Sequence, residues 1–400
     1  MLTPEYLDIC ADDLVELYRQ LDESIVQILA ERIAKTDFVS DSSKWQAEIL
    51  QQSGMTYDEV VAEISGYTGK SDAELRKMFE AAGVETIAAD NEIYEKAGLT
   101  STGLKQSAVM TQMLKAGLAK TGGSLKNLTL TTANTVQTAY IESCNLAYMQ
   151  ISSGAMSYND AVRMAVRNAA SQGTTVLYPS GHKDQLDVAV RRAALTGVNQ
   201  TSAQIQLANA ADMGCNLVEV TAHIGARPAH AAWQGGIYMI NGASREYRNL
   251  AEATGYGTGA GLCGWNCRHN FYPYFDGIDV RAYKSSDLDS LKNDGYYEKE
   301  QKQRAFERQV RATRRELAGY DSAMKAAKTD EERAAIKQEF DRASVKLKKQ
   351  ERTLKEYCDN NGLVYDDSRV QTYYGKNTTQ GFGRSTSQKA VWANRKKSKK

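Results

Sequence analysis

Proline and cysteine are scarce in this 400-residue sequence, and long apolar runs are missing. Only Pro4 precedes Pro179, so the first half has almost no internal helix breaker of that kind. Six scattered cysteines make no disulfide framework and are expected to be free thiols in a reducing compartment. There is no run of about 18 apolar residues, so we expect no membrane-spanning helix and no membrane partner. The acidic N-terminal stretch lacks an apolar core, so secretory export is not expected.

Charge is nearly balanced, at a net +1, but it is unevenly distributed. Residues 1–100 carry 21 acidic and 8 basic side chains, residues 296–358 carry 12 acidic and 17 basic ones, and the last twenty residues carry seven basic and no acidic ones. An acidic head and a basic tail favour two different partners, and the tail suits phosphate backbones. The alternative is that both regions are merely solvated.

The first half has the spacing of amphipathic helices. Residues 5–35 carry one apolar stripe with spacings of three, four and seven, which predicts a single helix. Shorter helices are expected at 44–52, 57–65 and 71–82, the last opened by a capping box of Ser71 and Glu74. Residues 84–120 are expected to be helical with glycine breaks, followed by helices at 128–152 and 157–172. We interpret this half as a platform for binding a partner.

The pattern changes after residue 173. TTVLY (174–178) predicts a short strand, and residues 184–213 predict a long helix that Gly214 closes. NLVEVTAH (216–223) and GIYMI (236–240) predict two further strands. The segment HIGARPAH is therefore expected to be a loop in an α+β domain, where binding residues tend to lie.

Two charge-rich helices are expected at 296–318 and 329–359, with a break near Gly319 and Thr329. Their sparse apolar positions could pair them as a hairpin: Phe306, Val310, Leu317, Ile336, Phe340, Val345, Leu347 and Leu354. A solvent-exposed hairpin without a ligand is the alternative to one that contacts DNA. Residues 363–375 predict a short strand or an irregular arm, and residues 381–400 are expected to be disordered.

Side chains that can bind metal ions or take part in catalysis are concentrated in HIGARPAHAAWQGG (223–236) and CGWNCRHNFYPY (263–274). Five of them are competent zinc ligands, but their C-x3-C and H-x6-H spacings match no standard zinc pair: His223, His230, Cys263, Cys267 and His269. A nucleophilic Cys267 oriented by Asn266 would need a lowered thiol pKa, which a sequence cannot show. A nuclease site would lack the carboxylates that hold a hard metal.

The structural interpretation of the same residues is favoured. Arg227 can bond to carbonyl groups, Pro228 stiffens the turn, Trp233 buries a large apolar area, and Gln234 can satisfy backbone groups. The glycines of GYGTGAGLCGWN (255–266) allow close chain approaches and positive φ angles, and no phosphate-binding motif accompanies them.

Four stretches together resemble the phage minor capsid protein 2 family: VAVRRAALTGVNQTSAQIQ, TAHIGARPAHAAWQG, TGYGTGAGLCGWNCRHNFYPYFDG and YEKEQKQRAFERQVRATRREL. The resemblance covers about residues 175–320 and extends distantly to Mu F-like head morphogenesis proteins. It implies a low-copy, portal-associated component of a tailed-phage head that contacts packaged DNA. The signature positions that it implies are His223, Gly225, Arg227, Pro228, His230, Trp233, Gln234, Gly235, Asn266, Cys267, Arg268 and His269. It implies no catalytic role for them.

We therefore predict a predominantly helical α+β protein with four parts. A helical region (1–173) docks on the portal or neighbouring head proteins. An α+β signature domain (174–295), a charged helical hairpin (296–360), and an irregular arm with a flexible basic tail (361–400) follow. We expect no enzyme activity, no cofactor and no metal ion.

The expected location is the virion, after synthesis in the bacterial cytoplasm, with the portal, other head proteins and packaged double-stranded DNA as partners. The tail residues expected to contact DNA are Arg384, Lys389, Arg395, Lys396, Lys397, Lys399 and Lys400. The rival hypothesis is a phage-borne thiol- or metal-dependent hydrolase centred on Cys267, His223 and His230.

Overall fold

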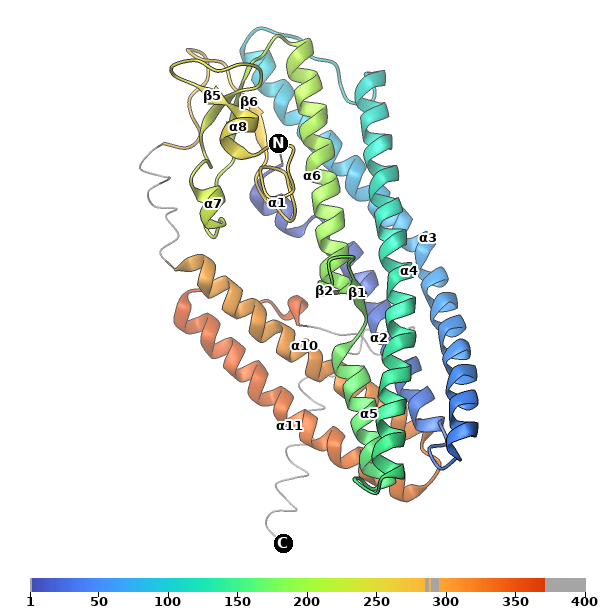
Figure 1. The fold of residues 1–400 in the computed structure, drawn as a ribbon. Helices are drawn as coiled ribbons and strands as arrows, with labels where there is room; N and C mark the ends of the chain where they lie inside the picture. Colours follow the sequence, from blue (N-terminus) through green and yellow to red (C-terminus); the bar gives the residue numbers. More distant parts are fainter. Residues whose placement is uncertain (1, 285–287, 289–294, 371–400) are drawn as a thin grey trace. The chain divides into compact units, whose positions relative to one another are not determined.

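The computed structural model describes residues 2–284, 288 and 295–370 (Figure 1). The chain forms two compact units, each assembled from three separate stretches. The first unit consists of Met1–Val15, Lys70–Asn127 and Val188–Glu298, and the second of Glu16–Gly69, Leu128–Asp187 and the chain from Lys299 onward. Each unit is therefore completed by contacts between residues that are far apart in sequence.

Helices make up most of the described chain, with short strands between them, which confirms the predicted α+β and predominantly helical class. The helices are α1 (Pro4–Ile9), α2 (Asp12–Lys35), α3 (Ser42–Lys96), α4 (Ala108–Ser152), α5 (Tyr158–Gln172), α6 (Leu186–Asp212), α7 (Pro228–Ala231), α8 (Leu250–Thr254), α10 (Tyr296–Ala326), α11 (Asp330–Asn361) and the 3-10 helix η1 (Asp367–Arg369). The strands are β1 (Thr175–Leu177), β2 (Lys183–Gln185), β3 (Leu217–Val220), β4 (Ile237–Met239), β5 (Arg248–Asn249) and β6 (Phe271–Pro273).

Two long helices replace the series of short ones expected in the first half. α3 runs for 55 residues and α4 for 45, so the predicted breaks within 44–82 are wrong. Ser71 and Glu74 lie inside α3 rather than at a helix start, and the capping box predicted there is therefore also wrong. A glycine inside a helix costs only about 1 kcal/mol relative to alanine, which the burial of an apolar stripe can offset.

The two ends of this helical half differ in how well the pattern predicted them. The helix expected over 5–35 is two helices, because Cys10 and Ala11 interrupt it between α1 and α2. α5 begins as predicted, since the Ser157 side chain caps its first turn by accepting a hydrogen bond from the Asp160 N–H. The apolar stripe of α2 is buried as expected, including Leu14, Leu21 and Ile25.

The first unit contains a four-stranded sheet in the order β5–β4–β3–β6. β3 is antiparallel to both β4 and β6, and β5 pairs in parallel with β4. Val218 lies opposite Tyr238, and Val220 lies opposite Phe271. These four side chains share one buried core with Ala203 of α6, so α6 packs against the sheet. The strands predicted within 216–223 and 236–240 are confirmed.

Within the first unit, α4 and α6 approach each other closely at two glycines. A Cβ atom on Gly117 of α4 would collide with Oγ1 of Thr201 on α6, and a Cβ atom on Gly197 of α6 would collide with Oγ1 of Thr121 on α4. This reciprocal arrangement requires that both positions lack a side chain. It holds α6, which carries part of the candidate site, against α4.

In the second unit, α10 and α11 pair side by side as predicted. Arg314 contacts Glu351 over 2.7 Å, Lys346 contacts Glu316 over 3.1 Å, and the rings of Phe306 and Tyr357 are 5.2 Å apart. The start of α11 at a Thr329 capping box matches the sequence, because Thr329 and Glu332 satisfy each other's backbone N–H groups.

The break expected near Gly319 is wrong, because α10 continues to Ala326. A Cβ atom on Gly319 would lie 2.7 Å from that of Ala170 on α5. The glycine therefore serves the close packing of α10 on α5 and does not end the helix.

The arginines of α10 are turned into the second unit. Arg311 lies 3.9 Å from Asp187, and Arg315 lies 3.5 Å from Asp22. Arg311, Arg314 and Arg315 are all buried. Buried cations need carboxylate partners of this kind. The alternative of a solvent-exposed hairpin is therefore wrong for this face of α10.

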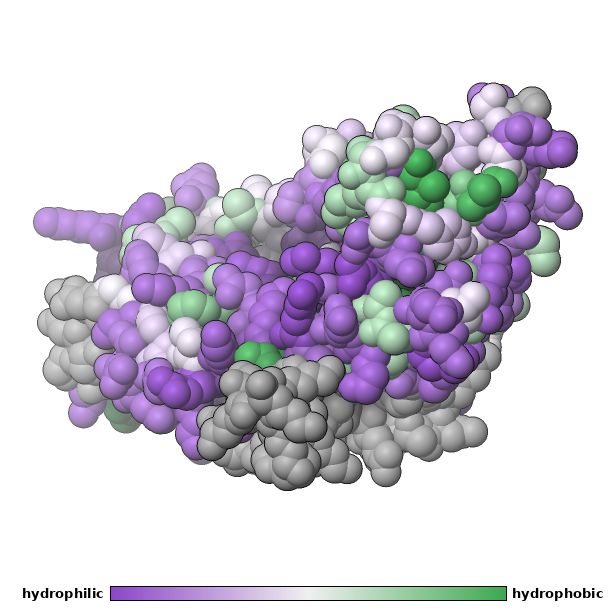
Figure 2. All heavy atoms as spheres, turned by 90° about the horizontal axis from the view of Figure 1, so that it is seen from below, coloured by the Kyte–Doolittle hydropathy of each residue, from purple (hydrophilic) through white to green (hydrophobic). Residues whose placement is uncertain are grey.

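None of the helices in the described ranges is long and apolar enough to cross a membrane. Figure 2 shows a face on which hydrophilic residues predominate and apolar residues form small separate groups.

Candidate functional site

Two loops of the first unit meet at one end of the strands of the four-stranded sheet. The first loop leaves β3 after Val220, passes through α7 and returns as β4, while the second runs from α8 to β6. Because Val220, just before the first loop, pairs with Phe271, just after the second, the start of the first loop lies beside the end of the second. Strand pairing therefore brings residues 223–236 and 263–270 together.

At the centre of this junction, His230, Cys267 and His269 form a buried group. Cys267 Sγ lies 3.7 Å from His230 Nδ1 and 3.6 Å from His269 Nδ1. The three residues are 3%, 2% and 1% exposed, and their donor atoms all lie within 4.8 Å of one another. The same junction holds Trp233, whose ring centroid is 4.6 Å from that of His230 and 4.9 Å from that of His269.

The outer nitrogens of the two imidazoles are held by carbonyl oxygens. His230 Nε2 lies 2.8 Å from the Ala260 carbonyl oxygen, and His269 Nε2 lies 3.1 Å from Oε1 of Gln234. The same Oε1 accepts the backbone N–H of His223 over 3.1 Å, which fixes the orientation of the Gln234 amide. Both Nε2 atoms therefore donate, and both Nδ1 atoms face the sulfur of Cys267.

A buried asparagine on α6 holds the second loop in place. Asn199 Nδ2 donates to the carbonyl oxygens of Cys267 over 3.0 Å and His269 over 2.9 Å. Its own Oδ1 accepts a hydrogen bond from Asn270 Nδ2 over 2.8 Å. The Asn270 N–H in turn donates to Thr221 Oγ1 over 3.0 Å. Asn199, Asn270 and Thr221 are all buried, so each of these hydrogen bonds satisfies polar groups that water cannot reach.

The second loop has an unusual backbone. Cys263 and Asn266 have φ angles of 57° and 54°, and they are the only non-glycine residues with positive φ in the described part of the chain. Gly255 and Gly257 also have positive φ, and a Cβ atom on Gly261 would collide with the backbone of Gly255. The prediction that glycines here serve close approaches and positive φ angles is confirmed. Strained non-glycine residues persist only where their surroundings fix them.

The remaining predicted residues have separate roles around this centre. Arg227 donates to the Trp265 carbonyl oxygen over 2.8 Å, Arg268 lies 3.5 Å from the Asp8 carboxylate, and Pro228 occupies the first turn of α7. Gly225 and Gly235 both have positive φ. The first loop is therefore stiffened at several points.

His223 and Cys263 lie next to the central group but outside it. The His223 ring is 4.4 Å from that of His269, yet its Nδ1 faces the Ile224 carbonyl oxygen at 2.7 Å. The Cys263 thiol points to the His269 carbonyl oxygen at 3.7 Å. Of the five competent ligands in the sequence, three converge.

Electrostatics disfavour a nucleophilic thiol when no ion is bound. Burial raises the pKa of the Cys267 thiol and lowers the pKa of both His230 and His269. Burial, together with Arg268, lowers the pKa of His223 to about 4. A thiolate–imidazolium pair needs the opposite shifts. A hydrolase that uses Cys267 as its nucleophile is therefore not supported.

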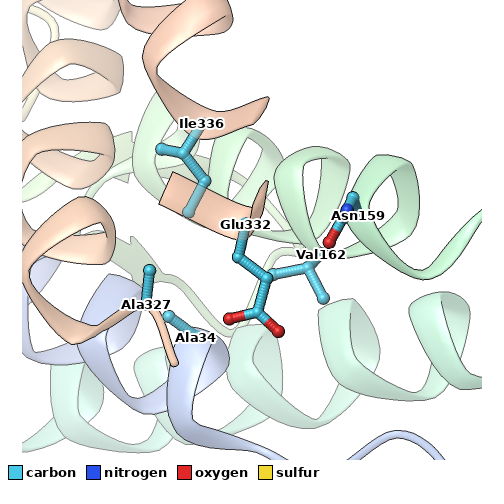
Figure 3. A pocket seen from close by; sticks show the side chains of 6 residues that line it. All are labelled: Ala34, Asn159, Val162, Ala327, Glu332 and Ile336. Atoms are coloured by element: carbon cyan, nitrogen blue, oxygen red, sulfur yellow. The ribbon is translucent and has the colours of Figure 1, made fainter. Parts of the chain in front are cut away.

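A small pocket lies elsewhere, within the second unit, and offers no site chemistry (Figure 3). It is lined by Ala34, Asn159, Val162, Ala327, Glu332 and Ile336. The Glu332 carboxylate already accepts the N–H groups of Lys328 and Thr329. The seven basic residues predicted to contact DNA, from Arg384 to Lys400, lie outside the described residues.

Sequence reasoning missed Asn199 and Thr221, and it considered Asn270 only for a nuclease site and not for its structural role, because a polar residue within a helix or beside a strand gives no signal of its partner. It also missed which ligands converge. The informative spacing was Cys267-x-His269, since alternate residues of an extended chain lie on the same side.

Comparison with known proteins agrees with the family resemblance seen in the sequence. The family model described as phage minor capsid protein 2 matches residues 2–359. A structural protein of Lactococcus phage LL-H is 26% identical over 316 residues, which cover 74% of this chain and 84% of that protein. A structural protein of Lactococcus phage mv4 is 46% identical over 57 residues, covering 14% of this chain and 45% of that protein. No solved structure matches the chain.

Proposed function

Because this chain belongs to the phage minor capsid protein 2 family, we propose that it is a low-copy component of the phage head that docks on the portal and contacts the packaged DNA. The match over residues 2–359 carries this proposal, since it includes the long helices as well as the two loops. The family membership makes the chain a phage structural protein. Its position in the head, its docking on the portal and its contact with DNA are the proposed parts.

Quantitative mass spectrometry of purified particles tests the location and the copy number. We expect tens of copies at most beside the far more abundant major capsid subunit. Absence from mature particles, with presence in assembly intermediates, would contradict a virion component and favour a scaffold-like role.

The helical half offers candidate docking side chains. Leu146 and Met149 lie three residues apart on one face of α4, and they are 39% and 57% exposed. Changing both to serine should reduce incorporation into particles without lowering the melting temperature, because the side chains contribute little to the core. Changing the exposed Lys115 and Lys120 of α4 to serine serves as the control. Unchanged incorporation of the Leu146 and Met149 variant would exclude this face as the docking surface.

The proposed DNA contact is assigned to the last twenty residues. The buried α10 arginines are already paired within the second unit, whereas the tail carries seven basic and no acidic residues. Deleting residues 376–400 should leave the melting temperature unchanged and remove most of the salt-dependent affinity for double-stranded DNA. A variant with the seven basic residues replaced by glutamine keeps the length and should behave like the deletion. Unchanged affinity for DNA in both variants would contradict the proposed DNA contact.

A further inference from the structure

We propose that His230 Nδ1, Cys267 Sγ and His269 Nδ1 bind one zinc ion that ties the loop around α7 to the loop before β6. This differs from the sequence-based expectation of no metal and is independent of the proposed function in the phage head. The first support is the spacing of the donor atoms. Sulfur lies 3.7 Å and 3.6 Å from the two nitrogens. Bonds of about 2.3 Å to sulfur and about 2.0–2.1 Å to nitrogen, at tetrahedral angles, place sulfur and nitrogen about 3.6 Å apart.

The second support is the orientation of the two imidazoles. Each Nε2 donates to a carbonyl oxygen, of Ala260 for His230 and of the Gln234 side chain for His269. In a neutral ring this leaves the lone pair on Nδ1, facing Cys267. Histidine ligands in metal sites are held in this way, with the outer nitrogen bonded to a carbonyl or carboxylate.

The third support is a shortage of hydrogens at the centre. A neutral Cys267 has one hydrogen on sulfur and can satisfy only one of the two Nδ1 lone pairs at a time. The other lone pair would face a sulfur atom in a site that is nearly closed to water. A cation bound to a thiolate and two imidazoles satisfies all three donors together. On binding, the thiol releases its proton to the solvent and forms the metal–sulfur bond.

The donor set selects the kind of metal. One thiolate and two imidazoles favour zinc over magnesium or calcium, which prefer oxygen ligands. Among the described residues, three donors converge, which leaves the fourth tetrahedral position for a water molecule or another small ligand. Because the donors come from both loops, the ion acts as a cross-link at one end of the strands.

Metal analysis of the purified full-length chain, after dialysis against metal-free buffer, tests the proposal. We expect one zinc per chain. Cys267→Ser and His230→Ala should each lose at least ten-fold in zinc affinity. Cys263→Ser is the matched control, because this thiol lies in the same loop and is equally buried but points to the His269 carbonyl oxygen, and it should keep its zinc. Zinc retained by Cys267→Ser, or no zinc in the wild-type protein when zinc is supplied, would overturn the proposal.

X-ray absorption at the zinc edge keeps the test decisive if the variants do not fold, since it uses the wild-type protein. The expected spectrum has one sulfur neighbour at about 2.3 Å and nitrogen or oxygen neighbours at about 2.0–2.1 Å, with the multiple scattering typical of imidazole. A spectrum with two or more sulfur neighbours, or with none, would overturn the assignment to these three residues.

Discussion

Asn270 donates its side-chain amide to the side-chain carbonyl of Asn199 over 2.8 Å, and both residues are fully buried. This single bond joins α6 to the start of β6 across 71 positions of sequence. Asn199 at the same time holds the carbonyl oxygens of Cys267 and His269. The geometry of the candidate site therefore depends on a residue that lies outside both of its loops.

Replacing Asn199 by alanine should strongly destabilise the first unit. The carbonyl oxygens of Cys267 and His269 and the side-chain amide of Asn270 each lose a hydrogen-bond partner. At about 1–3 kcal/mol for each buried group, we expect a loss of about 3 kcal/mol or more in the free energy of unfolding. Chemical denaturation measures this loss. Gln200→Ala is the control, because Gln200 is the next residue on α6 and is only half-buried, so this change should alter stability by less than about 1 kcal/mol. Equal effects of the two substitutions would contradict the role of Asn199.

Two glycines of α4 should respond in opposite ways to alanine. Gly117→Ala should lower the melting temperature, because the new methyl group collides with Thr201 on α6. Gly123→Ala should raise the free energy of unfolding by about 0.5–1 kcal/mol, because a Cβ atom there has open space and alanine is the better helix former. Thermal unfolding followed by circular dichroism compares them, and a stabilising Gly117→Ala would show that α4 and α6 are not in close contact.

Asp90 should make stability depend on pH. Burial raises its pKa to about 7, against about 3.9 in an unfolded chain. As pH rises from about 4 to 7, the unfolded chain has already lost this proton while the folded chain still holds it. The carboxyl group's contribution to stability therefore falls across this range and is constant above it.

Asp90→Asn should remove this pH dependence and keep an acceptor for Gln206 Nε2. We expect the variant to be more stable than the wild type by about 4 kcal/mol at pH 8 and nearly equal to it at pH 4. Denaturant midpoints at the two pH values give the comparison, with exposed Glu92→Gln of the same helix as the control. A difference that does not change with pH would show that Asp90 is ionised in the folded chain.

The capping box of α11 offers a prediction for the second unit. Thr329→Ala removes the oxygen that accepts the Glu332 N–H and should cost about 1–2 kcal/mol of stability. Thr329→Ser keeps the hydroxyl group and should stay within about 0.5 kcal/mol of the wild type. Thermal unfolding of both variants checks the expectation, and equal losses would assign the effect to the threonine methyl group instead.

The sequence predicted elements well where a local signal decides them. Ser157 and Thr329 begin α5 and α11 as expected, and alternating residues predicted β3 and β4. Local signals failed where tertiary packing decides. Gly54 and Gly66 remain within one helix, and Gly319 marks a contact with α5 rather than a helix end.

The candidate site shows the same division. The two loops could be identified from their rare residues, but which side chains converge could not. His230 meets Cys267 because β3 pairs with both β4 and β6, and the Asn199 clamp spans 68 positions to Cys267. Such pairings depend on strand register, which a single sequence specifies only through the complete fold.

The three-part construction of each unit has a consequence for how the protein is made. The first unit begins at the N-terminus but needs residues up to 298, and the second also needs the chain from Lys299 onward. At a synthesis rate of about 5–20 residues per second, roughly 15–60 s separate the appearance of residue 15 from that of residue 298. During that interval the apolar stripes of α3 and α4 have emerged while their later partners have not. A growing chain therefore exposes these surfaces on the ribosome, where chaperones or premature association compete with folding. A message cut short before codon 298 leaves both units incomplete, whereas one cut just after it leaves only the second unit incomplete.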